Sequence, residues 1–508
     1  MAHAANPERL TVADLHGDLD RSLAALRADA GRVRASRRIV EAALEDGATY
    51  YGINTGFGAL ARERIAPADT ERLQQNLIVS HAVGVGPLVP KAVARLMLQL
   101  KVHALGLGFS GVSEATFERL LVMAERDLVP AVPSRGSLGA SGDLAPLSHL
   151  ALPLLGRGRV WDEAGGATRP AAEALAEHGL DPVTLRAKDG LALINGTQLM
   201  SAYGAFVLHR AHHLLKTADV LAAMSLEALQ GSATPFDARI QAVRPHPGQA
   251  VVAENVRALL GESEILESHR TCGKVQDPYS LRCVPQVHGA SRDVLAHATS
   301  VVETEINSVT DNPLVFDDGD PSIVSGGNFH GQPLALALDY AALALAELAS
   351  VAERRVYLLV SGYDGLPVFL MRETGLNSGF MMPQYTAAAL VSENKVLCHP
   401  ASVDSIPSSR GQEDHVSMGS VAALKLFDVL RNVEHVLAVE LMTAAQALDY
   451  RAPLRPGRGV EAAHRHLRAQ VRHREADDGF GGDLTACLHC VQEGGLAAAA
   501  EAEVGTLR

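Results

Sequence analysis

The tripeptide Ala140-Ser141-Gly142 and the glycines around it constrain this chain more than any other feature. Gly136 and Gly139 precede the tripeptide, so the backbone can adopt the positive φ angles and tight turns that other residues resist. In such a turn the Gly142 nitrogen can approach the carbonyl carbon of Ala140, because glycine has no Cβ to block it. Attack with loss of one water closes a five-membered ring, and loss of the Ser141 hydroxyl as a second water leaves an exocyclic C=C. The tripeptide therefore predicts an electrophile that the chain builds from itself.

A simpler interpretation of these residues is a glycine-rich loop in which Ser141 caps a helix that begins near Asp143. The wider segment favours the electrophile. Residues 136–149 read Gly-Ser-Leu-Gly-Ala-Ser-Gly-Asp-Leu-Ala-Pro-Leu-Ser-His, which resembles the signature of the aromatic amino acid ammonia-lyases. Members of that family carry a self-made cofactor, 4-methylidene-imidazol-5-one (MIO). The resemblance implies MIO formed from residues 140–142, with no metal or nucleotide cofactor.

Charge and cysteine content limit the possible partners and compartment. The formal net charge of −13 argues against nucleic acid or an anionic membrane as the main partner. Five scattered cysteines suit a reducing cytoplasm, and the N-terminal residues lack the basic and apolar regions of an export signal. The pair Cys487 and Cys490 has no matching second half for a zinc site. We therefore expect a cytoplasmic protein without a metal.

Long helical patterns dominate the second half of the chain. They cover residues 187–231, 331–360 and 416–451, and a helix of about 35 residues is roughly 50 Å long. Little strand signal separates them, which predicts a bundle of long antiparallel helices. Charged residues interrupt the apolar segment from Pro333 to Val360, so we expect a buried helix there and not a membrane span.

We expect a mainly α chain in three parts. Residues 1–200 form a loop-rich domain that carries the tripeptide, residues 201–451 the bundle, and residues 452–508 a C-terminal helical appendage. The family resemblance implies the fumarase/aspartase-like superfamily.

Two local patterns are open to checking. Residues 10–45 look helical, with Ser36 as a plausible cap and Gly47 as a plausible stop. The glycines from Gly106 to Gly111 fit a dinucleotide-binding fingerprint, but residues 92–105 fit a helix at least as well as a strand. No alternation of strands and helices surrounds them, so we do not expect a dinucleotide site.

Two polar segments precede the tripeptide. Residues 50–58 form a glycine-rich loop that presents Tyr51 and Asn54. In the family a similar loop forms a lid over the substrate, and its tyrosine takes part in proton transfer. A single histidine on an apolar helix, such as His81, is usually a core residue. Ser80-His81 matches the family's selectivity position, however, where phenylalanine and tyrosine enzymes tend to carry Phe-Leu or His-Leu. The serine–histidine pair resembles the histidine-specific enzymes.

Polar groups also follow the tripeptide. Asn195 begins the first long helical pattern, where a cap is its simplest role. Gln276, Tyr279 and Arg282 are three residues apart, which fits one helical face. A surface face would explain this spacing equally well, but Tyr-x-x-Arg also presents a phenol beside a fork for a carboxylate. Residues 325–330 form another glycine loop, which exposes Phe329.

Glu413 lies just before the third long pattern and could be a helix N-terminal acid. In the family this segment reaches the active site. Glutamate at this position resembles the histidine enzymes, where phenylalanine enzymes tend to have glutamine. A carboxylate that faces an imidazole can hold or exchange a ring proton.

The resemblance implies removal of ammonia from L-histidine to give trans-urocanate, the first step of histidine degradation. MIO supplies the electrophile and Tyr51 the base for the β-proton, with its pKa lowered beside MIO and Arg282; Glu413 is the second candidate base. Arg282 binds the substrate carboxylate. The remaining implied roles are orientation of the amino group and the MIO carbonyl (Asn195, Gln276, Tyr279) and lining of the imidazole end (His81, Met381, Glu413, with Phe329 nearby). The resemblance also implies a homotetramer whose subunits share each site.

Three alternatives stay open. The chain could act on another aromatic amino acid, as a lyase or a 2,3-aminomutase. It could be a catalytically silent member of the family, or a fumarase-like lyase without MIO, although the latter does not explain Ala-Ser-Gly. Two small departures from the family pattern are Pro278, where alanine is expected, and Gln332, where glutamate is common.

Overall fold

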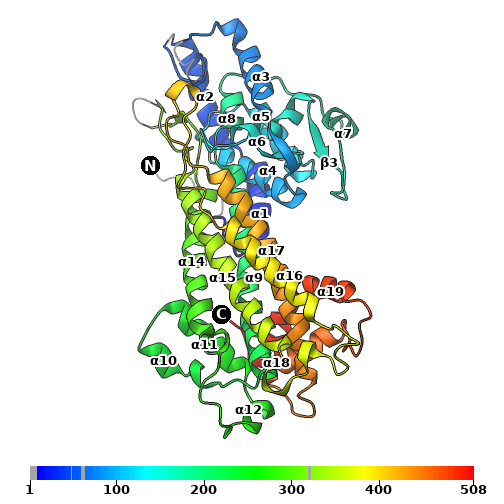
Figure 1. Cartoon of the computed structure of the whole chain (residues 1–508). Helices are drawn as coiled ribbons and strands as arrows, with labels where there is room; N and C mark the ends of the chain where they lie inside the picture. The colour runs from blue at the N-terminus through cyan, green and yellow to red at the C-terminus, as the bar shows by residue number, and fades with distance from the viewer. Residues whose placement is uncertain (1–8, 47, 59–62, 319–321) are drawn as a thin grey trace. The chain divides into compact units, whose positions relative to one another are not determined.

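The computed structural model of the chain describes residues 9–46, 48–58, 63–318 and 322–508 (Figure 1). The α-helices are α1 (Leu15–Ala28), α2 (Gly31–Glu45), α3 (Thr70–His81), α4 (Lys91–Gly106), α5 (Glu114–Glu125), α6 (Leu144–Ala151), α7 (Ala171–Glu177), α8 (Asp189–Ile194), α9 (Gln198–Ala228), α10 (Ala238–Ala242), α11 (Pro247–Leu259), α12 (Glu264–Ser268), α13 (Tyr279–Arg282), α14 (Val284–Ile306), α15 (Gln332–Val360), α16 (Met381–Leu397), α17 (Gly419–Asp449), α18 (Arg458–Arg468), α19 (Gly481–Glu493) and α20 (Gly495–Val504).

The strands form three short antiparallel ladders. These pair β1 (Val85–Leu88) with β2 (Pro133–Arg135), β3 (Arg159–Trp161) with β4 (Thr168–Pro170), and β5 (Leu314–Val315) with β6 (Ile323–Val324). Short 3₁₀ turns connect other elements: η2 (Pro67–Asp69), η3 (Leu152–Leu155), η4 (Thr234–Phe236), η5 (Tyr363–Gly365), η6 (Val368–Leu370) and η7 (Ser409–Gly411). The expectation of a mainly α chain is confirmed.

The chain divides into two compact units, each built from three segments. The first unit contains Met1–Phe206, Thr299–Asp339 and Pro400–Leu424; the second contains Val207–Ala298, Tyr340–His399 and Lys425–Arg508. Both units therefore combine segments that are distant in sequence. The division into consecutive domains at residues 200 and 451 stays a prediction.

The three predicted long helices are present as α9, α15 and α17, with 31, 29 and 31 residues. They run in the same direction: Gly419 at the start of α17 lies against Met200 and Ala335 near the starts of α9 and α15. Further along, Glu440 of α17 accepts hydrogen bonds from side chains of α9 and α15. The antiparallel partners are two helices that the sequence patterns did not identify.

These two helices, α14 and α16, alternate with the long ones. Ser291 of α14 donates to the Ala344 carbonyl, whereas Val302 of the same helix packs near Leu338, so α14 runs opposite to α15. In α16, Gln384 donates to Glu353 and Cys398, just after the helix, donates to the Ala342 carbonyl, so α16 also runs opposite to α15. Among α9, α14, α15, α16 and α17, each helix is thus antiparallel to the next one along the chain.

Three local expectations can be compared with the structure. Helix α15 is long and apolar enough to span a membrane by length and composition, but 67% of its most apolar window is buried, as a core helix requires. The residues before Gly106 form helix α4, which agrees with the rejection of a dinucleotide fingerprint. The prediction that Ser36 caps a helix is wrong: Ser36 lies inside α2 and donates to the Val33 carbonyl. Gly47 and the N-terminal residues 1–8 lie outside the described residues.

A buried ion pair joins α15 to α17 within the second unit. Arg355 Nε lies 2.5 Å from Glu440 Oε1 and Arg355 Nη2 lies 2.9 Å from Oε2, and neither side chain is exposed. Ser225 of α9 donates to the same carboxylate at 2.8 Å. Because a buried charge is costly without its partner, this pair fixes how the three helices align.

We expect Glu440→Gln to lower the free energy of unfolding by about 3–5 kcal/mol, because it leaves the Arg355 guanidinium buried without its counter-charge. Chemical unfolding followed by circular dichroism measures the change. The double variant Arg355→Met, Glu440→Leu removes both charges and is expected to lose less than Glu440→Gln alone. A Glu440→Gln variant within about 1 kcal/mol of the parent would contradict this role.

Candidate functional site

The tripeptide forms the tight turn that the sequence predicts. Gly139 and Gly142 pair across it as an antiparallel bridge, with φ angles of +76° and +81°. Ser141 also has a positive φ of +52°, which is uncommon for a residue with a side chain. Backbone in this region of φ/ψ space is strained, and such strain gathers at functional sites. The turn therefore bends the chain where ring closure would require it.

Gly142 lies so close to Gly196 that no side chain would fit. A Cβ on Gly142 would lie 2.0 Å from the Gly196 carbonyl oxygen. Two backbone hydrogen bonds join these segments: Asp143 N donates to Gly196 O at 2.7 Å, and Gly196 N donates to Ser141 O at 3.4 Å. The segment at Gly196 is therefore the surface against which the tripeptide turn is held.

Asp143 ties the turn to the start of α9. Its carboxylate accepts from the backbone N–H groups of Leu199 and Met200 at 3.0 and 3.1 Å. Ser137 Oγ donates to the other carboxylate oxygen at 3.3 Å. The side chain is fully buried, and burial raises the pKa of the Asp143 carboxyl to about 7. Sequence reasoning treated this residue only as part of the signature and assigned it no role.

Glu413 reaches the tripeptide from a segment almost three hundred residues further along. Ser141 Oγ donates to Glu413 Oε1 at 3.3 Å, and Ser408 Oγ donates to Oε2 at 2.6 Å. The Ser408 amide also donates to the Glu413 carbonyl at 2.9 Å, which closes the loop around η7. One carboxylate oxygen thus faces the serine hydroxyl while the other is held in place.

Tyr51 lies on the glycine-rich loop of the same unit. Its hydroxyl oxygen accepts a hydrogen bond from the Gly58 amide at 3.1 Å. Burial raises the pKa of the Tyr51 phenol; the Gly58 hydrogen bond opposes this with a smaller effect, and the nearby Glu413 carboxylate adds a still smaller increase. The net shift of the Tyr51 pKa in this chain is upward, mainly through burial, and the expected lowering beside MIO and Arg282 stays a prediction.

Asn195 does not begin α9, contrary to the prediction. It is the C-cap residue of α8, and α9 starts at Gln198 because Gly196 interrupts the helix with a φ of +124°. The Asn195 amide nitrogen donates to the Asn312 carbonyl at 3.0 Å and to Asp311 Oδ1 at 3.4 Å. Its oxygen Oδ1 is buried and has no hydrogen-bond partner among the described residues. A buried acceptor of this kind is available to a ligand.

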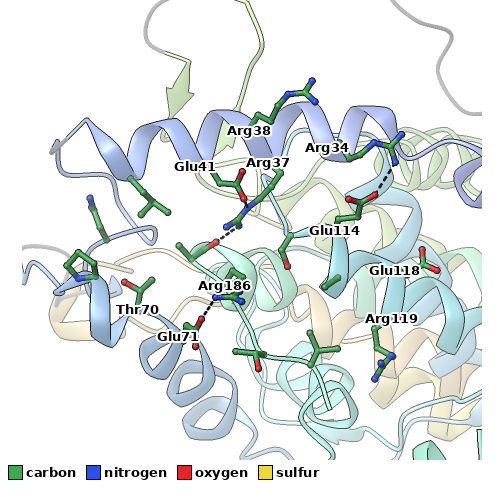
Figure 2. A pocket seen from close by; sticks show the side chains of 18 of the residues that line it. Arg34, Arg37, Arg38, Glu41, Thr70, Glu71, Glu114, Glu118, Arg119 and Arg186 are labelled. Carbon is green, nitrogen blue, oxygen red and sulfur yellow. Dashed lines mark hydrogen bonds and ion pairs between the residues drawn. The ribbon is translucent and has the colours of Figure 1, made fainter. Parts of the chain in front are cut away.

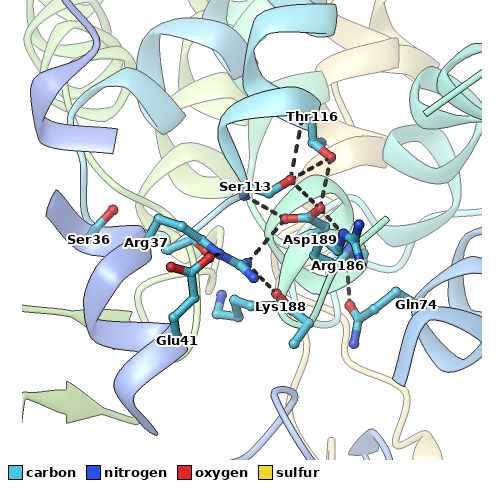
Figure 3. A network of polar contacts seen from close by, with 12 residues as sticks. Ser36, Arg37, Glu41, Gln74, Ser113, Thr116, Arg186, Lys188 and Asp189 are labelled. Carbon is cyan, nitrogen blue, oxygen red and sulfur yellow. Dashed lines mark hydrogen bonds and ion pairs between the residues drawn. The ribbon is translucent and has the colours of Figure 1, made fainter. Parts of the chain in front are cut away.

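A buried polar network anchors α8, the helix that leads to Asn195 (Figure 3). The Asp189 carboxylate accepts from Ser113 N and Oγ, at 2.7 and 2.6 Å, and from Thr116 Oγ1 at 2.8 Å. Arg37 of α2 donates to the Ala187 carbonyl at 2.8 Å. Asp189 itself is fully buried, and burial raises the pKa of its carboxyl. The position of Asn195 therefore depends on α2, α5 and α8 together.

Four predicted site residues belong to the second unit. Tyr279 and Arg282 form the two ends of α13, and the Arg282 guanidinium carbon lies 4.5 Å from the centre of the Tyr279 ring. The phenol and the guanidinium are thus side by side, as Tyr-x-x-Arg predicts. Gln276 lies before α13, so the prediction that it shares their helical face is wrong. Met381 is the first residue of α16.

The two remaining predicted residues are in the first unit. His81 is the last residue of α3, and its Nδ1 lies 2.8 Å from the Leu77 carbonyl oxygen and 3.0 Å from Ser80 Oγ. Nε2 is the ring nitrogen left for another partner. Phe329 is half-buried in the loop between β6 and α15.

A cavity of about 1280 Å³ lies beside the Tyr51 loop, and Asn54 is among its lining residues (Figure 2). Arginine side chains are frequent in its walls, and carboxylates compensate their positive charge. Ion pairs join Arg34 to Glu114, Arg37 to Glu41 and Arg186 to Glu71. Its lining includes neither the tripeptide nor Glu413. This cavity therefore does not contain the candidate reacting groups at the tripeptide.

The chain is similar to known proteins over most of its length. The aromatic amino acid lyase family model matches residues 10–469. A curated histidine ammonia-lyase from Anaeromyxobacter dehalogenans (strain 2CP-C) is 57% identical over 92% of this chain and 93% of its own length.

Two solved structures also match. The histidine ammonia-lyase from Trypanosoma cruzi has a TM-score of 0.86 and 43% identity, covering 93% of this chain and 89% of that one. The tyrosine aminomutase from Streptomyces globisporus has a TM-score of 0.90 and 37% identity, covering 99% of both chains. The chain therefore belongs to the aromatic amino acid lyase family and is a carbon–nitrogen lyase.

Proposed function

We propose that this lyase removes ammonia from L-histidine to give trans-urocanate, the first step of histidine degradation. The observation that carries the proposal is the contact of Ser141 Oγ with Glu413 Oε1, at 3.3 Å, inside a strained tripeptide turn. It places the residue that would become the electrophile beside a carboxylate suited to an imidazole. The name that the curated relatives share, histidine ammonia-lyase, supports the same substrate.

The tripeptide supplies all the atoms of its own cofactor. Gly142 N bonds to the Ala140 carbonyl carbon, and that carbonyl oxygen leaves as water with the amide hydrogens of Gly142 and Ser141. The Ser141 hydroxyl and Cα hydrogen leave as the second water, so no oxidant is needed. The close approach of Gly142 to Gly196 and the positive φ of Ser141 fit this closure. Once formed, MIO supplies an electrophile for the substrate's amino group or its ring.

The chain's own side chains bind and orient the substrate. The Arg282 guanidinium, stacked beside Tyr279, would hold the carboxylate through paired hydrogen bonds. Asn195 Oδ1, which lacks a partner among the described residues, would accept a hydrogen bond from the amino group, and Gln276 would help to orient it. His81, Met381 and Glu413 would line the imidazole end, with Phe329 nearby.

Proton transfer needs a base near the β-carbon. Tyr51 is the proposed base. Glu413 is the second candidate, because its carboxylate is close enough to the Tyr51 phenol to affect the phenol's pKa. We further propose that the enzyme is a cytoplasmic homotetramer in which subunits share each site. In that assembly the residues of the second unit, Tyr279 and Arg282 among them, can come from a neighbouring subunit.

Substrate and cofactor can be tested together. The purified protein is incubated separately with L-histidine, L-tyrosine and L-phenylalanine, and the ultraviolet absorbance of each conjugated acid is followed. We expect urocanate from histidine alone, and loss of this activity by at least about 10³-fold in Ser141→Ala, which lacks the hydroxyl that must leave as water. Intact mass should show the parent protein two waters lighter than its sequence, and Ser141→Ala without this loss.

Other outcomes identify the alternatives. Formation of cinnamate or coumarate would still support the MIO cofactor but would contradict the proposed roles of His81 and Glu413. A β-amino acid product would identify an aminomutase. Absence of any product together with the full mass of the sequence would favour a silent family member.

The two candidate bases can be separated by pH. Because the pKa of Tyr51 is raised, its phenolate is scarce at neutral pH, and kcat/KM should rise with pH until the phenol has ionised. Tyr51→Phe should lower kcat by about 10²–10⁴-fold and abolish this rise. Glu413→Gln should mainly raise KM for histidine. The assignment is wrong if Glu413→Gln loses the pH-dependent rise and Tyr51→Phe keeps it.

A further inference from the structure

A lysine is buried in the core of the first unit, next to the segment that contacts the tripeptide. Lys101 is on α4, and only 2% of its surface is exposed. Its neighbours on this helix, such as Leu100 and Val102, are buried hydrophobic residues. Burying an ammonium group costs several kcal/mol unless other groups compensate it, and methionine or leucine would fill the same space without that cost. A buried lysine at this position therefore indicates a role for its ammonium group that an apolar side chain could not fill.

The ammonium group contacts the segment that holds the tripeptide. Lys101 Nζ donates to the Asn195 carbonyl oxygen at 2.6 Å and lies 3.5 Å from Gln198 Oε1. The Asn195 carbonyl belongs to the same peptide group as the Gly196 N–H, which donates to Ser141 O. A single peptide group thus connects the ammonium to the backbone of the tripeptide.

A second buried lysine acts on the side chain of the same asparagine. Lys188 Nζ lies 2.8 Å from Asp311 Oδ2, and Asp311 Oδ1 accepts from the Asn195 amide nitrogen at 3.4 Å. Lys188 is fully buried and Asp311 is only 4% exposed. One lysine therefore holds the backbone of Asn195, and the other holds its side chain through Asp311.

The charges in this cluster compensate one another. Burial lowers the pKa of the Lys101 ammonium to about 7, with a smaller effect of Lys188 in the same direction, and the carboxylates of Asp311 and Asp143 oppose both. The cluster contains two lysines and two aspartates drawn from four separate segments. Its members lie around Asn195 and Gly196, and Asp143 also accepts from the first amides of α9.

We infer that Lys101 is a positioning residue that fixes the Asn195–Gly196 peptide group against the tripeptide, so that ring closure and substrate orientation depend on its contact with the Asn195 carbonyl. Lys101 touches neither the substrate nor the reacting atoms. It keeps Gly196 N–H aimed at Ser141 O, the oxygen that ring closure retains, and Gly196 O on the Asp143 amide. This inference rests on the proposed function, because the closure it supports is part of that proposal.

The test compares freshly synthesised, full-length variants as they fold, because chains purified after folding would already have lost the two waters. Lys101→Met keeps the length of the side chain and removes its charge, whereas the smaller Lys101→Gln keeps a polar N–H. The control is His103→Leu on the same helix, a buried residue whose partner is Ser22 of α1 at 2.7 Å. Intact mass at successive times gives the fraction of chains that have lost two waters. Thermal unfolding and the kinetic constants per cyclised chain are measured in parallel.

We expect Lys101→Met to cyclise about 10- to 100-fold more slowly than the parent protein, because small displacements of reacting groups have effects of this size. Its unfolding temperature should stay close to that of the parent, and the chains that do cyclise should show a lower kcat. Lys101→Gln should cyclise at a rate between those of Lys101→Met and the parent protein. His103→Leu should lose stability but cyclise at the parental rate.

Two outcomes overturn the inference. One is a folded Lys101→Met that cyclises and turns over like the parent protein. The other is failure of both Lys101 variants to fold, since the lysine would then serve the fold alone. Failure of the proposed function is seen separately, because the parent protein and His103→Leu would then retain the full mass of their sequences.

Discussion

The contact between the tripeptide turn and the Gly196 peptide is the constraint on which the site depends. Gly142 can approach Gly196 this closely because Gly142 has no side chain, and Asp143 then secures the turn by accepting from the first amides of α9. The turn is therefore held by backbone on one side and by a helix N-terminus on the other. Preorganisation of this kind removes much of the entropic cost of bringing two backbone atoms together.

The predictable parts of this structure are those with local signals. The turn follows from its glycines, and α15 and α17 follow from long apolar repeats. Helix α14 was missed because Pro285 and Gly289 and its many polar residues hide the apolar period. Asn195 was misplaced for a related reason: the helical composition continues through Gly196, whose φ of +124° nevertheless ends one helix before the next begins. Such a break depends on tertiary contacts that a single sequence does not reveal.

The site residues, too, could be predicted only where a local motif marks them. Ser141, Tyr51 and Glu413 come from segments with recognisable motifs, and the first unit brings Ser141 and Glu413 into contact. Lys101 and Asp311 have no motif, because their partners are distant in sequence and a lysine within an apolar helix looks like an isolated exception. A lone charge inside a strongly apolar helical pattern is nevertheless a signal, since the cost of burying it requires a partner somewhere in the fold.

Two of the buried charge systems among the described residues serve different ends. Arg355 and Glu440 join two long helices of the second unit, where a pair of apolar side chains could fill the same space. Near the tripeptide, Lys101 contacts the Asn195 carbonyl, and Lys188 contacts the Asp311 carboxylate, which itself holds the Asn195 side chain. An apolar replacement there would leave the carbonyl without its donor at the point where one peptide group links α8 to the tripeptide. We therefore expect that the first system can be exchanged for packing, whereas the second orients Asn195 and Gly196, whose placement the proposed ring closure needs.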